Sequence, residues 1–215
     1  DGTQHEPRQG PQLLALQAQI LASPLLFAQN PSQAWQFLTE QISRALYADR
    51  VSVWLFSAAD ILQCIDLFEY KNKSHHQGGS LQRSKYPLYF RALTQDVLIA
   101  ASDAATHAAT AEFNDGYLQS AGICSMLDAV IQSEQGLCGV ICIEQVSTSR
   151  HWTVDEQHFV TAMASVASTV HTFSQHLSLQ RDYQLLLDKQ EMASRHGRIG
   201  FWEASTVNDD LWWSP

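Results

Sequence analysis

The chain carries few basic side chains. Of its 215 residues only 13 are Lys or Arg, against 22 Asp or Glu, and the formal net charge is −9. Nucleic acids and anionic membrane surfaces are bound through clustered positive charge. The Lys and Arg residues are spread thinly, so we expect no nucleic-acid partner and no membrane contact for this segment.

Cysteines and long apolar runs are also scarce. None of the four cysteines (Cys64, Cys124, Cys138 and Cys142) forms a CxxC pair, and three lie inside apolar runs. Buried free thiols are the expected state, rather than redox or metal-binding groups. No signal peptide opens the chain, and no apolar run approaches the roughly 20 residues that span a bilayer. We therefore expect a soluble, cytoplasmic segment, although the parent protein could carry an anchor elsewhere.

Catalytic and metal-binding motifs are missing as well. The sequence contains no P-loop, GxSxG or HExxH motif, no evident nucleophile–base pair and no zinc-ligand spacing. His75 and His76 fall in a polar stretch and are expected to be solvated. His107 is the one histidine that we consider as a haem or iron ligand. The fragment is predicted not to be an enzyme, and its cofactor, if any, is unknown.

Hydrophobic residues make up 45% of the chain and charged residues 16%, a composition typical of a packed globular domain. Helical periodicity begins at Pro11 and again at Asn30-Pro31, where Asn suits a cap and Pro the first turn. The pattern then alternates. It predicts hairpins over 51–70 and 125–146, a loop over 71–80, short helices over 87–93 and 112–121, and a strand over 97–102.

The longest predicted helix opens at a capping box, Thr153 to Glu156. Apolar residues follow in a 4-3-4-3-4 heptad spacing, at Phe159, Met163, Val166, Val170, Phe173 and Leu177. The strict spacing would next fall on Gln180 and Gln184, so the register slips, and Leu179, Tyr183 and Leu186 could carry the seam on. The seam predicts a homodimer through the C-terminal helix. The predicted division is an N-terminal extension (1–30), a sensor domain (31–174), a connecting coiled-coil helix (175–197) and the start of another domain (198–215).

Three sequence blocks carry a family resemblance: Tyr117 to Ile131, Gly136 to Glu144 and Arg150 to Glu156. They resemble the "YL…GI.SML..PI", "G.L.GVLC.E" and "R.WT.DE..F" blocks of bacterial sensor GAF domains. The resemblance implies an α+β fold: a GAF-like antiparallel sheet with helices on both faces and a long C-terminal signalling helix. The tail from Ile199 to Pro215 is similar to the opening of a PAS domain.

The same region is similar to the photosensory GAF domains of phytochromes, with two departures. Asn114 stands where those domains place a bilin-contacting His, and no Cys occupies the preceding helix turn. Glu144-Gln145 stands where the "NKFDE" motif of cyclic-nucleotide-binding GAF domains would begin. We therefore expect neither a covalent bilin nor a cyclic nucleotide.

Candidate pocket residues are taken from the resemblance and from position. Asp103 matches an Asp that faces the bilin in phytochromes, although its side chain could instead cap the next turn. Asp128 lies within an apolar strand, and alternation favours a solvent-facing side chain over a paired buried one. The full candidate set is Trp54, Phe90, Asp103, Phe113, Tyr117, Met126, Asp128 and Glu144.

The resulting functional hypothesis is a regulatory small-molecule sensor domain of a multidomain bacterial signalling protein, of the histidine kinase or diguanylate cyclase type. An unidentified small molecule would bind beside the sheet and bias the dimeric helix. Two alternatives stay open at this level. One is a ligand-free dimerisation GAF domain whose pocket is filled by Trp54, Phe90 and Met126, and the other is a haem or iron sensor.

Overall fold

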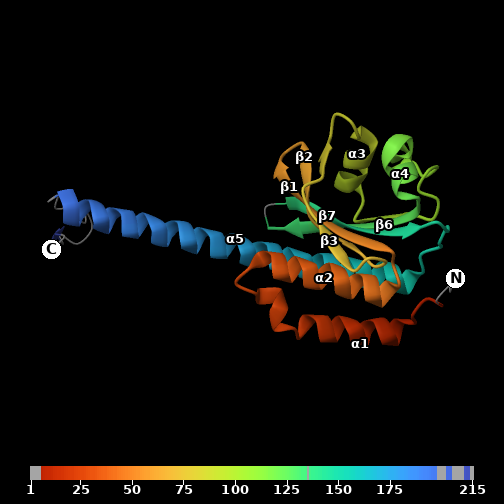
Figure 1. Cartoon of the computed structure of the whole chain (residues 1–215), viewed down its shortest axis with the longest axis horizontal. Helices are drawn as coiled ribbons and strands as arrows, with labels where there is room; N and C mark the ends of the chain where they lie inside the picture. The colour runs from red at the N-terminus through yellow and green to blue at the C-terminus, as the bar shows by residue number, and fades with distance from the viewer. Residues whose placement is uncertain (1–5, 135, 198–201, 205–210, 214–215) are drawn as a thin grey trace. The chain divides into compact units, whose positions relative to one another are not determined.

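A central antiparallel sheet divides the domain into two layers of packing (Figure 1). The computed structural model describes residues 6–134, 136–197, 202–204 and 211–213. The strand order of the sheet is β3-β2-β1-β7-β6-β5, and β4 also pairs with β2. The strands are β1 Arg50–Ala58, β2 Ile61–Glu69, β3 Ser74–His76, β4 Ser80–Gln82, β5 Leu98–Ala101, β6 Ile123–Ser133 and β7 Gly136–Val146.

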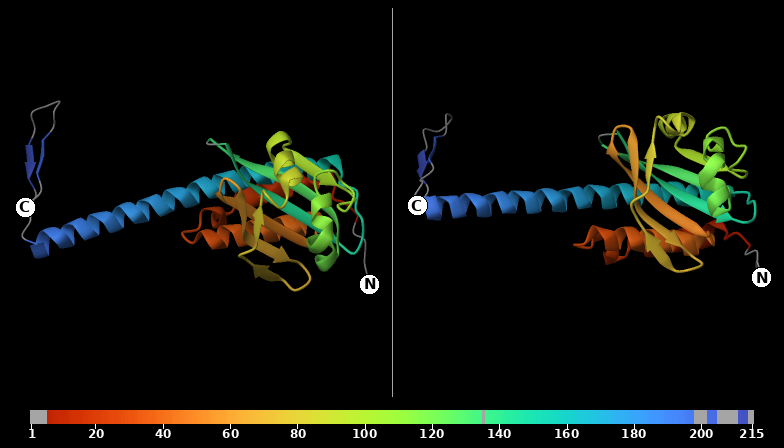
Figure 2. Two further views of the ribbon diagram at one scale, coloured as in Figure 1. Left: turned by 90° about the horizontal axis from the view of Figure 1, so that it is seen from above. Right: turned by 45° about the horizontal axis from the view of Figure 1, so that its top comes forward.

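Helices cover both faces of this sheet (Figures 1 and 2). They are α1 Gly10–Leu21, the 3₁₀ turn η1 Pro24–Phe27, α2 Pro31–Leu46, α3 Pro87–Gln95, the turns η2 Ala111–Phe113 and η3 Asn114–Leu118, α4 Gln119–Ala121 and α5 Val154–Gly197. Figure 1 shows α2 and the start of α5 on one face, with α1 beyond α2, while α3 and α4 lie over the other face. The predicted α+β, GAF-like class is confirmed.

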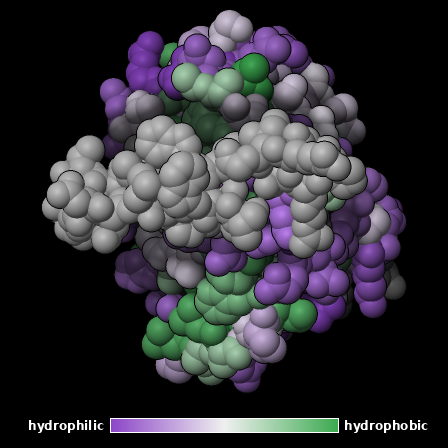
Figure 3. Space-filling view, turned by 90° about the vertical axis from the view of Figure 1, so that its left-hand side faces the viewer, coloured by the Kyte–Doolittle hydropathy of each residue, from purple (hydrophilic) through white to green (hydrophobic). Residues whose placement is uncertain are grey.

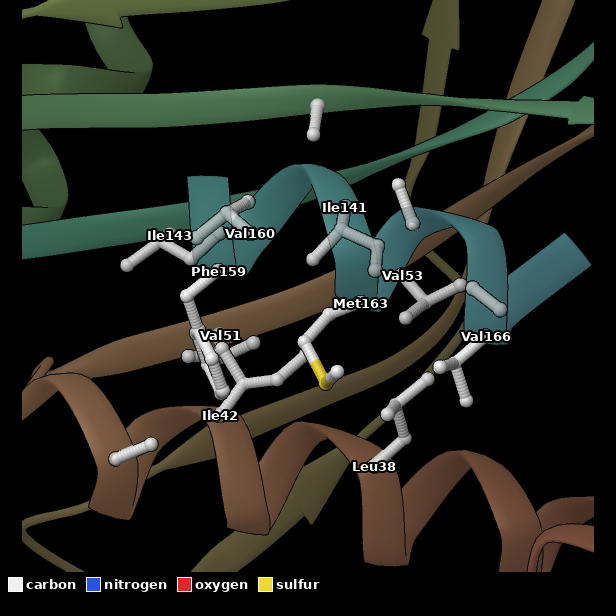
Figure 4. Packing of buried hydrophobic residues seen from close by; sticks show 14 of the residues in the cluster. Leu38, Ile42, Val51, Val53, Ile141, Ile143, Phe159, Val160, Met163 and Val166 are labelled. Atoms are coloured by element: carbon white, nitrogen blue, oxygen red, sulfur yellow. The ribbon is translucent and has the colours of Figure 1, made fainter. Parts of the chain in front are cut away.

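The face that packs on α2 and α5 holds a large cluster of buried apolar side chains. Alternate strand residues, such as Val53 on β1 and Ile141 on β7, meet Leu38 of α2 and Met163 of α5 (Figure 4). These side chains are fully buried. Burial of a Leu or Met side chain contributes about 1.5–3 kcal/mol, so this layer is a main source of the domain's stability.

The predicted heptad seam is partly wrong as a dimer surface. Phe159, Met163, Val166 and Val170 are at most 6% exposed, because they pack in the domain's own core (Figure 4). Heptad spacing records one apolar helix face, and that face here meets the sheet and α2. These four side chains are therefore not available to a second helix.

The chain divides into two compact units, Asp1–Thr172 and Phe173–Pro215. In the second unit, α5 continues to Gly197, and β8 Trp202–Ala204 pairs antiparallel with β9 Leu211–Trp213. The other residues of 198–215 lie outside the described part of the chain, and so does most of the stretch that resembles a PAS domain. That resemblance stays a prediction.

Two predicted elements differ from the structure. The polar stretch 71–80 contains the short strand β3, which pairs with β2. The helix predicted over 112–121 is broken into η2, η3 and α4, and the backbone of Asp115 and Gly116 is non-helical. Gly116 has φ 125°, which a residue with a side chain rarely adopts, so the periodic pattern is interrupted at this residue.

Candidate functional site

The second sheet face, beneath α3, holds a row of polar side chains inside an apolar layer. We call it the α3 face and define it by residues on the three central strands: Arg50, Ser52 and Trp54 on β1, Met126, Asp128 and Val130 on β6, and Cys142 and Glu144 on β7. The strand register places Arg50 beside Glu144 and Asp128 beside Cys142. Asp128 and Glu144 are each 1% exposed, so two carboxyl groups lie in the interior.

Asp128 is held by a tyrosine from the covering helix. The Tyr89 hydroxyl on α3 donates a 2.8 Å hydrogen bond to Asp128 Oδ2 and lies 3.5 Å from Cys142 Sγ. The pKa of Asp128 is raised to about 8: burial is the largest cause and nearby Glu144 adds to it, while the hydrogen bonds from Tyr89 and Cys142 act in the opposite direction. Asp128 Oδ1 is buried and makes no hydrogen bond.

The prediction that Asp128 faces solvent is wrong. Strand alternation is correct, because Leu127 and Ala129 face the α2 side and Asp128 faces the other. That other face is covered by α3 rather than by water (Figure 2). Alternation identifies the residues that share a face but does not reveal whether a helix covers them.

Glu144 forms a second buried group with Arg50 and Tyr117. The Tyr117 hydroxyl donates to Glu144 Oε1 across 2.6 Å. Arg50 Nε lies 3.4 Å from Glu144 Oε2 and 3.5 Å from Glu69 Oε1, distances of ion pairs. Neither Arg50 Nε nor Glu144 Oε2 makes a hydrogen bond. Burial raises the pKa of Glu144, whereas Arg50 and the Tyr117 hydroxyl oppose that shift.

Aromatic rings surround these carboxyl groups. The Phe113 ring centre lies 4.8 Å from that of Tyr89, 4.7 Å from that of Tyr86 and 6.1 Å from that of Tyr117. The predicted lining residues Trp54, Phe90, Phe113 and Met126 all belong to this layer, and each is at most 8% exposed. The structure thus brings most of the predicted pocket residues together.

Asp103 lies apart from that layer. It is exposed, and its carboxylate accepts hydrogen bonds from Ala105 N at 3.1 Å and Thr106 Oγ1 at 2.8 Å, so it caps the turn that comes after β5. His107 lies in the same loop, and its Nδ1 accepts from Ala109 N at 3.3 Å. Within the described residues, no group of three or more His, Cys, Asp or Glu side chains is arranged to hold a metal ion.

Sequence reasoning missed three participants: Arg50, Tyr89 and Cys142. Arg50 opens β1 beside Glu144, and an arginine at the start of an apolar strand signals a buried partner. Tyr89 directly precedes the predicted Phe90, but α3 buries both of them together with Ala92 and Leu93. Because α3 is buried on more than one face, its buried residues do not follow a single amphipathic stripe.

His75 was expected to be solvated, and this is also wrong. Its Nδ1 lies 2.9 Å from Oδ2 of the fully buried Asp66, and its Nε2 lies 3.3 Å from Glu40 Oε1 on α2. Thr39 Oγ1 donates to the same Asp66 oxygen at 2.6 Å. This group joins α2 to the sheet on the face opposite to the α3 face. It is a structural connection between layers.

Two hollows border other parts of the domain. One, of about 380 Å³, lies among α1, η1 and α5 and is lined by Gln17, Leu21, Leu26, Phe27, Ala162, Ser165, Val166, Thr169 and Val170. The other, of about 410 Å³, lies near Arg8 and Tyr47. Neither is lined by the α3 face, whose space is occupied by aromatic side chains.

Comparisons with known proteins agree with this architecture. A family model for the GAF domain matches residues 30–170, and the chain belongs to the GAF family. GAF domains are sensory rather than catalytic. A search of curated proteins found no match. No helix in the described residues combines the length and hydropathy needed to cross a membrane.

Solved structures share the fold at low sequence identity. The GAF domain of a phosphoenolpyruvate-protein phosphotransferase from Coxiella burnetii is 20% identical with a TM-score of 0.57, covering 79% of this chain and 99% of that one. The equivalent domain from Acinetobacter is 13% identical with a TM-score of 0.58, covering 78% and 95%. The chromophore-binding domain of a Stigmatella aurantiaca bacteriophytochrome is 16% identical with a TM-score of 0.61, covering 79% and 63%.

Proposed function

We propose that this chain is the regulatory small-molecule sensor domain of a multidomain signalling protein, with a ligand site on the α3 face. The observation that carries the proposal is the buried carboxyl oxygen Asp128 Oδ1, which makes no hydrogen bond. A buried polar atom without a partner costs about 1–3 kcal/mol. Such a cost at the centre of the domain is explained when a ligand supplies the missing partner.

Access to the α3 face runs through the segment that covers it. Tyr117 is half-buried and comes directly after Gly116, whose surroundings are open and whose backbone is non-helical. Movement of η3 would withdraw the Tyr117 ring and hydroxyl and open a path to Glu144 and Asp128.

The signal would pass through the two central strands. Asp128 and Cys142 lie on the α3 face of β6 and β7, while their neighbours Leu127 and Ile143 pack on the helical side with Phe159 and Met163 of α5. A ligand that shifts β6 and β7 therefore changes the packing of α5. It acts as a switch only to the extent that it binds the two arrangements with different affinity.

In the proposed mechanism, the change in α5 packing is passed on through a helix dimer. Leu179, Tyr183 and Leu186 have a 4-3 heptad spacing in a register shifted from that of Leu177, and they are 65%, 63% and 63% exposed. Apolar side chains at such positions associate when two helices pair. We place this pairing in α5 beyond Phe173 and propose that it drives a kinase or cyclic-di-GMP synthase domain in the parent protein.

The experiment that tests the sensor proposal is native mass spectrometry of protein purified from its native host. The expected result is a retained small molecule in the wild-type protein and its loss in an Asp128→Asn/Glu144→Gln variant. An Asp60→Asn variant, changed at an exposed carboxylate 71% accessible in its side chain, should retain the molecule. A protein that carries nothing and binds nothing from its host's metabolite extract would contradict the proposal.

A second candidate is a ligand-free dimerisation domain. It is favoured by the aromatic side chains that fill the α3 face and by apolar surface elsewhere. Figure 3 shows a hydrophobic region at the lower edge of the molecule, over the end of α1 and η1, where Leu21 and Leu25 are 50% and 45% exposed. A Leu21→Glu/Leu25→Glu variant that is monomeric, while the mass spectrum shows no ligand, would support this candidate. An absorption spectrum of the same sample tests the haem alternative through a Soret band.

A further inference from the structure

We propose that the ligand of the α3 face is an organic cation, such as an amine, an amidine or a protonated nitrogen heterocycle, whose N–H group donates to Asp128 Oδ1. This inference rests on the sensor function proposed above and names the chemical class of its ligand. It comes from the charge balance, the hydrogen-bond inventory and the rings around Asp128.

Once ionised, Asp128 would have no counter-ion among the charged groups of the α3 face. Arg50 lies within ion-pair distance of Glu144 and Glu69, so its single positive charge is already shared between two carboxylates. Tyr89 and Cys142, the polar groups in contact with Asp128, are neutral. One positive charge from a ligand would complete the pairing, because a buried charge is stable only beside an opposite one.

The hydrogen bonds of the buried carboxyl groups also favour a ligand that donates. The Tyr89 hydroxyl occupies Asp128 Oδ2 and the Tyr117 hydroxyl occupies Glu144 Oε1. Glu144 Oε2 lies 3.4 Å from Arg50 Nε, so a small rotation joins the two atoms that lack partners there. Asp128 Oδ1 then remains as an acceptor that needs a donor. An ionised carboxylate accepts hydrogen bonds and donates none.

The rings that cover Asp128 suit a cation. Tyr86, Tyr89, Phe113 and Tyr117 form a chain of aromatic contacts with centre-to-centre distances of 4.7–6.1 Å. Aromatic faces attract a positive group through their quadrupole, and aromatic cages recognise ammonium ligands. A carboxyl group and aromatic rings in one buried layer offer a cation both forms of recognition, whereas an anionic ligand would be repelled by both.

Binding of a cation would be coupled to loss of the Asp128 proton. The groups that face Asp128 are Tyr89 from α3 and Cys142 and Glu144 from β7, and burial raises the Asp128 pKa to about 8. A cation binds the ionised form, so its affinity should rise about tenfold per pH unit from pH 6 and level off above pH 8. A neutral ligand that accepts a hydrogen bond from protonated Asp128 would show the opposite trend.

The test uses probes of matched shape and different charge. Benzamidinium and phenethylammonium are the cations, benzamide is the neutral probe and benzoate is the anion, each measured by isothermal titration calorimetry and thermal shift on the full chain. The expected result is a raised Tm and measurable Kd for at least one cation, with benzamide and benzoate at least tenfold weaker. Binding of benzoate or benzamide with equal or higher affinity, or no response to either cation, would overturn the inference.

Variants locate the binding on Asp128. Asp128→Asn keeps the shape and removes the charge, so cation affinity should fall at least tenfold and lose its pH dependence, while Asp60→Asn should match the wild type. Unchanged cation binding in Asp128→Asn would place the probe elsewhere and overturn the inference. If Asp128→Asn does not fold, Tyr89→Phe takes its place: loss of the hydroxyl that lowers the Asp128 pKa should move the rise in cation affinity to higher pH, and an unmoved rise would count against the proposal.

The outcomes separate this inference from the sensor function itself. A native ligand that is retained on the α3 face but carries no positive group would leave the sensor function standing and overturn the cation assignment. Absence of any native ligand, together with no response to the probes, would overturn both.

Discussion

The hydroxyl of Tyr89, on the helix α3, donates a 2.8 Å hydrogen bond to Asp128 Oδ2 in the middle of β6. This bond connects the covering helix to the central sheet through a carboxyl group that is 1% exposed. A change in the charge or the hydrogen-bond partner of Asp128 therefore directly affects how α3 packs on the sheet. The position of α3 is therefore coupled to the charge of Asp128 and to the group that Asp128 binds.

The first prediction concerns Asp128 and pH. Burial raises the Asp128 pKa from 3.8 to about 8, so between these values the folded state holds a proton that the unfolded state has lost. Folding stability from this group is therefore full below pH 4 and falls as pH rises towards 8. In Asp128→Asn this dependence is absent. The stability difference between variant and wild type should move in favour of the variant by up to about 1.4 kcal/mol per pH unit.

Urea denaturation at pH 5, 6 and 7 measures that difference directly. Glu144, whose pKa is also raised by burial, contributes a trend of the same sign to both proteins, so the difference reports Asp128 together with its interaction with Glu144. A constant difference across the three pH values would contradict the account of Asp128 as a buried carboxyl group with a raised pKa.

The second prediction concerns the connection between α2 and the sheet. Asp66→Ala removes a buried acceptor of Thr39 Oγ1 and the partner of the partly buried His75 Nδ1. Loss of these two hydrogen bonds to a buried carboxylate should destabilise the fold by about 1–3 kcal/mol. Asp60→Ala is the control, because its exposed ion pair with Arg83 contributes less than about 1 kcal/mol. Equal midpoints of urea denaturation for the two variants would refute this role for Asp66.

The third prediction concerns the close approach of β1 and β7. A Cβ added at Gly139 would lie 2.2 Å from the backbone oxygen of Trp54, so Gly139→Ala must push the strands apart and should cost at least about 2 kcal/mol. Gly78→Ala has open space and only an unfavourable φ of +93°, for which about 1 kcal/mol is expected. Chemical denaturation ranks the two variants, and an equal or smaller loss in Gly139→Ala would be inconsistent with this packing.

The fourth prediction tests the proposed helix dimer. A Leu179→Glu/Leu186→Glu variant places charges on the heptad positions and should be monomeric where the wild type is dimeric. Leu185→Glu is the matched control: Leu185 is 52% exposed but lies outside the heptad spacing. Light scattering coupled to size exclusion distinguishes the species. A wild-type monomer at high concentration, or a dimer that survives the double substitution, would remove the dimer from the proposed mechanism.

Local chemistry made several elements predictable from the sequence. The capping box is present, with Thr153 Oγ1 accepting from Glu156 N and Glu156 Oε2 accepting from Thr153 N, and α5 begins at Val154 as expected. Asn30 caps α2 through Ser32 N. The two main hairpins also match, because alternation and turn residues are properties of a few neighbouring positions. Together with the GAF-like blocks, these signals were sufficient for the fold class.

Other features depended on long-range geometry. A β-bulge between β1 and β2 pairs Trp54 with Cys64 but Val53 with Asp66, so these two residues of β2 face opposite sides of the sheet although they are two positions apart. Simple alternation places them on the same side, and the Asp66–His75 group was therefore invisible in the sequence. A bulge inserts one extra residue into a strand, so the later residues of that strand exchange faces.

The sequence by itself determined which residues share a helix or strand face, because that is set by the 3.6- and 2-residue periods of the backbone. Only the tertiary structure decided what covers each face. It places α3 and Tyr89 over Asp128, and it packs the first part of the heptad spacing of α5 against the domain's own core. By its pattern alone, the strand around Asp128 could have a solvent-exposed face, and the heptad spacing of α5 could form a dimer seam. Residues distant in the chain decide otherwise, because they cover both surfaces.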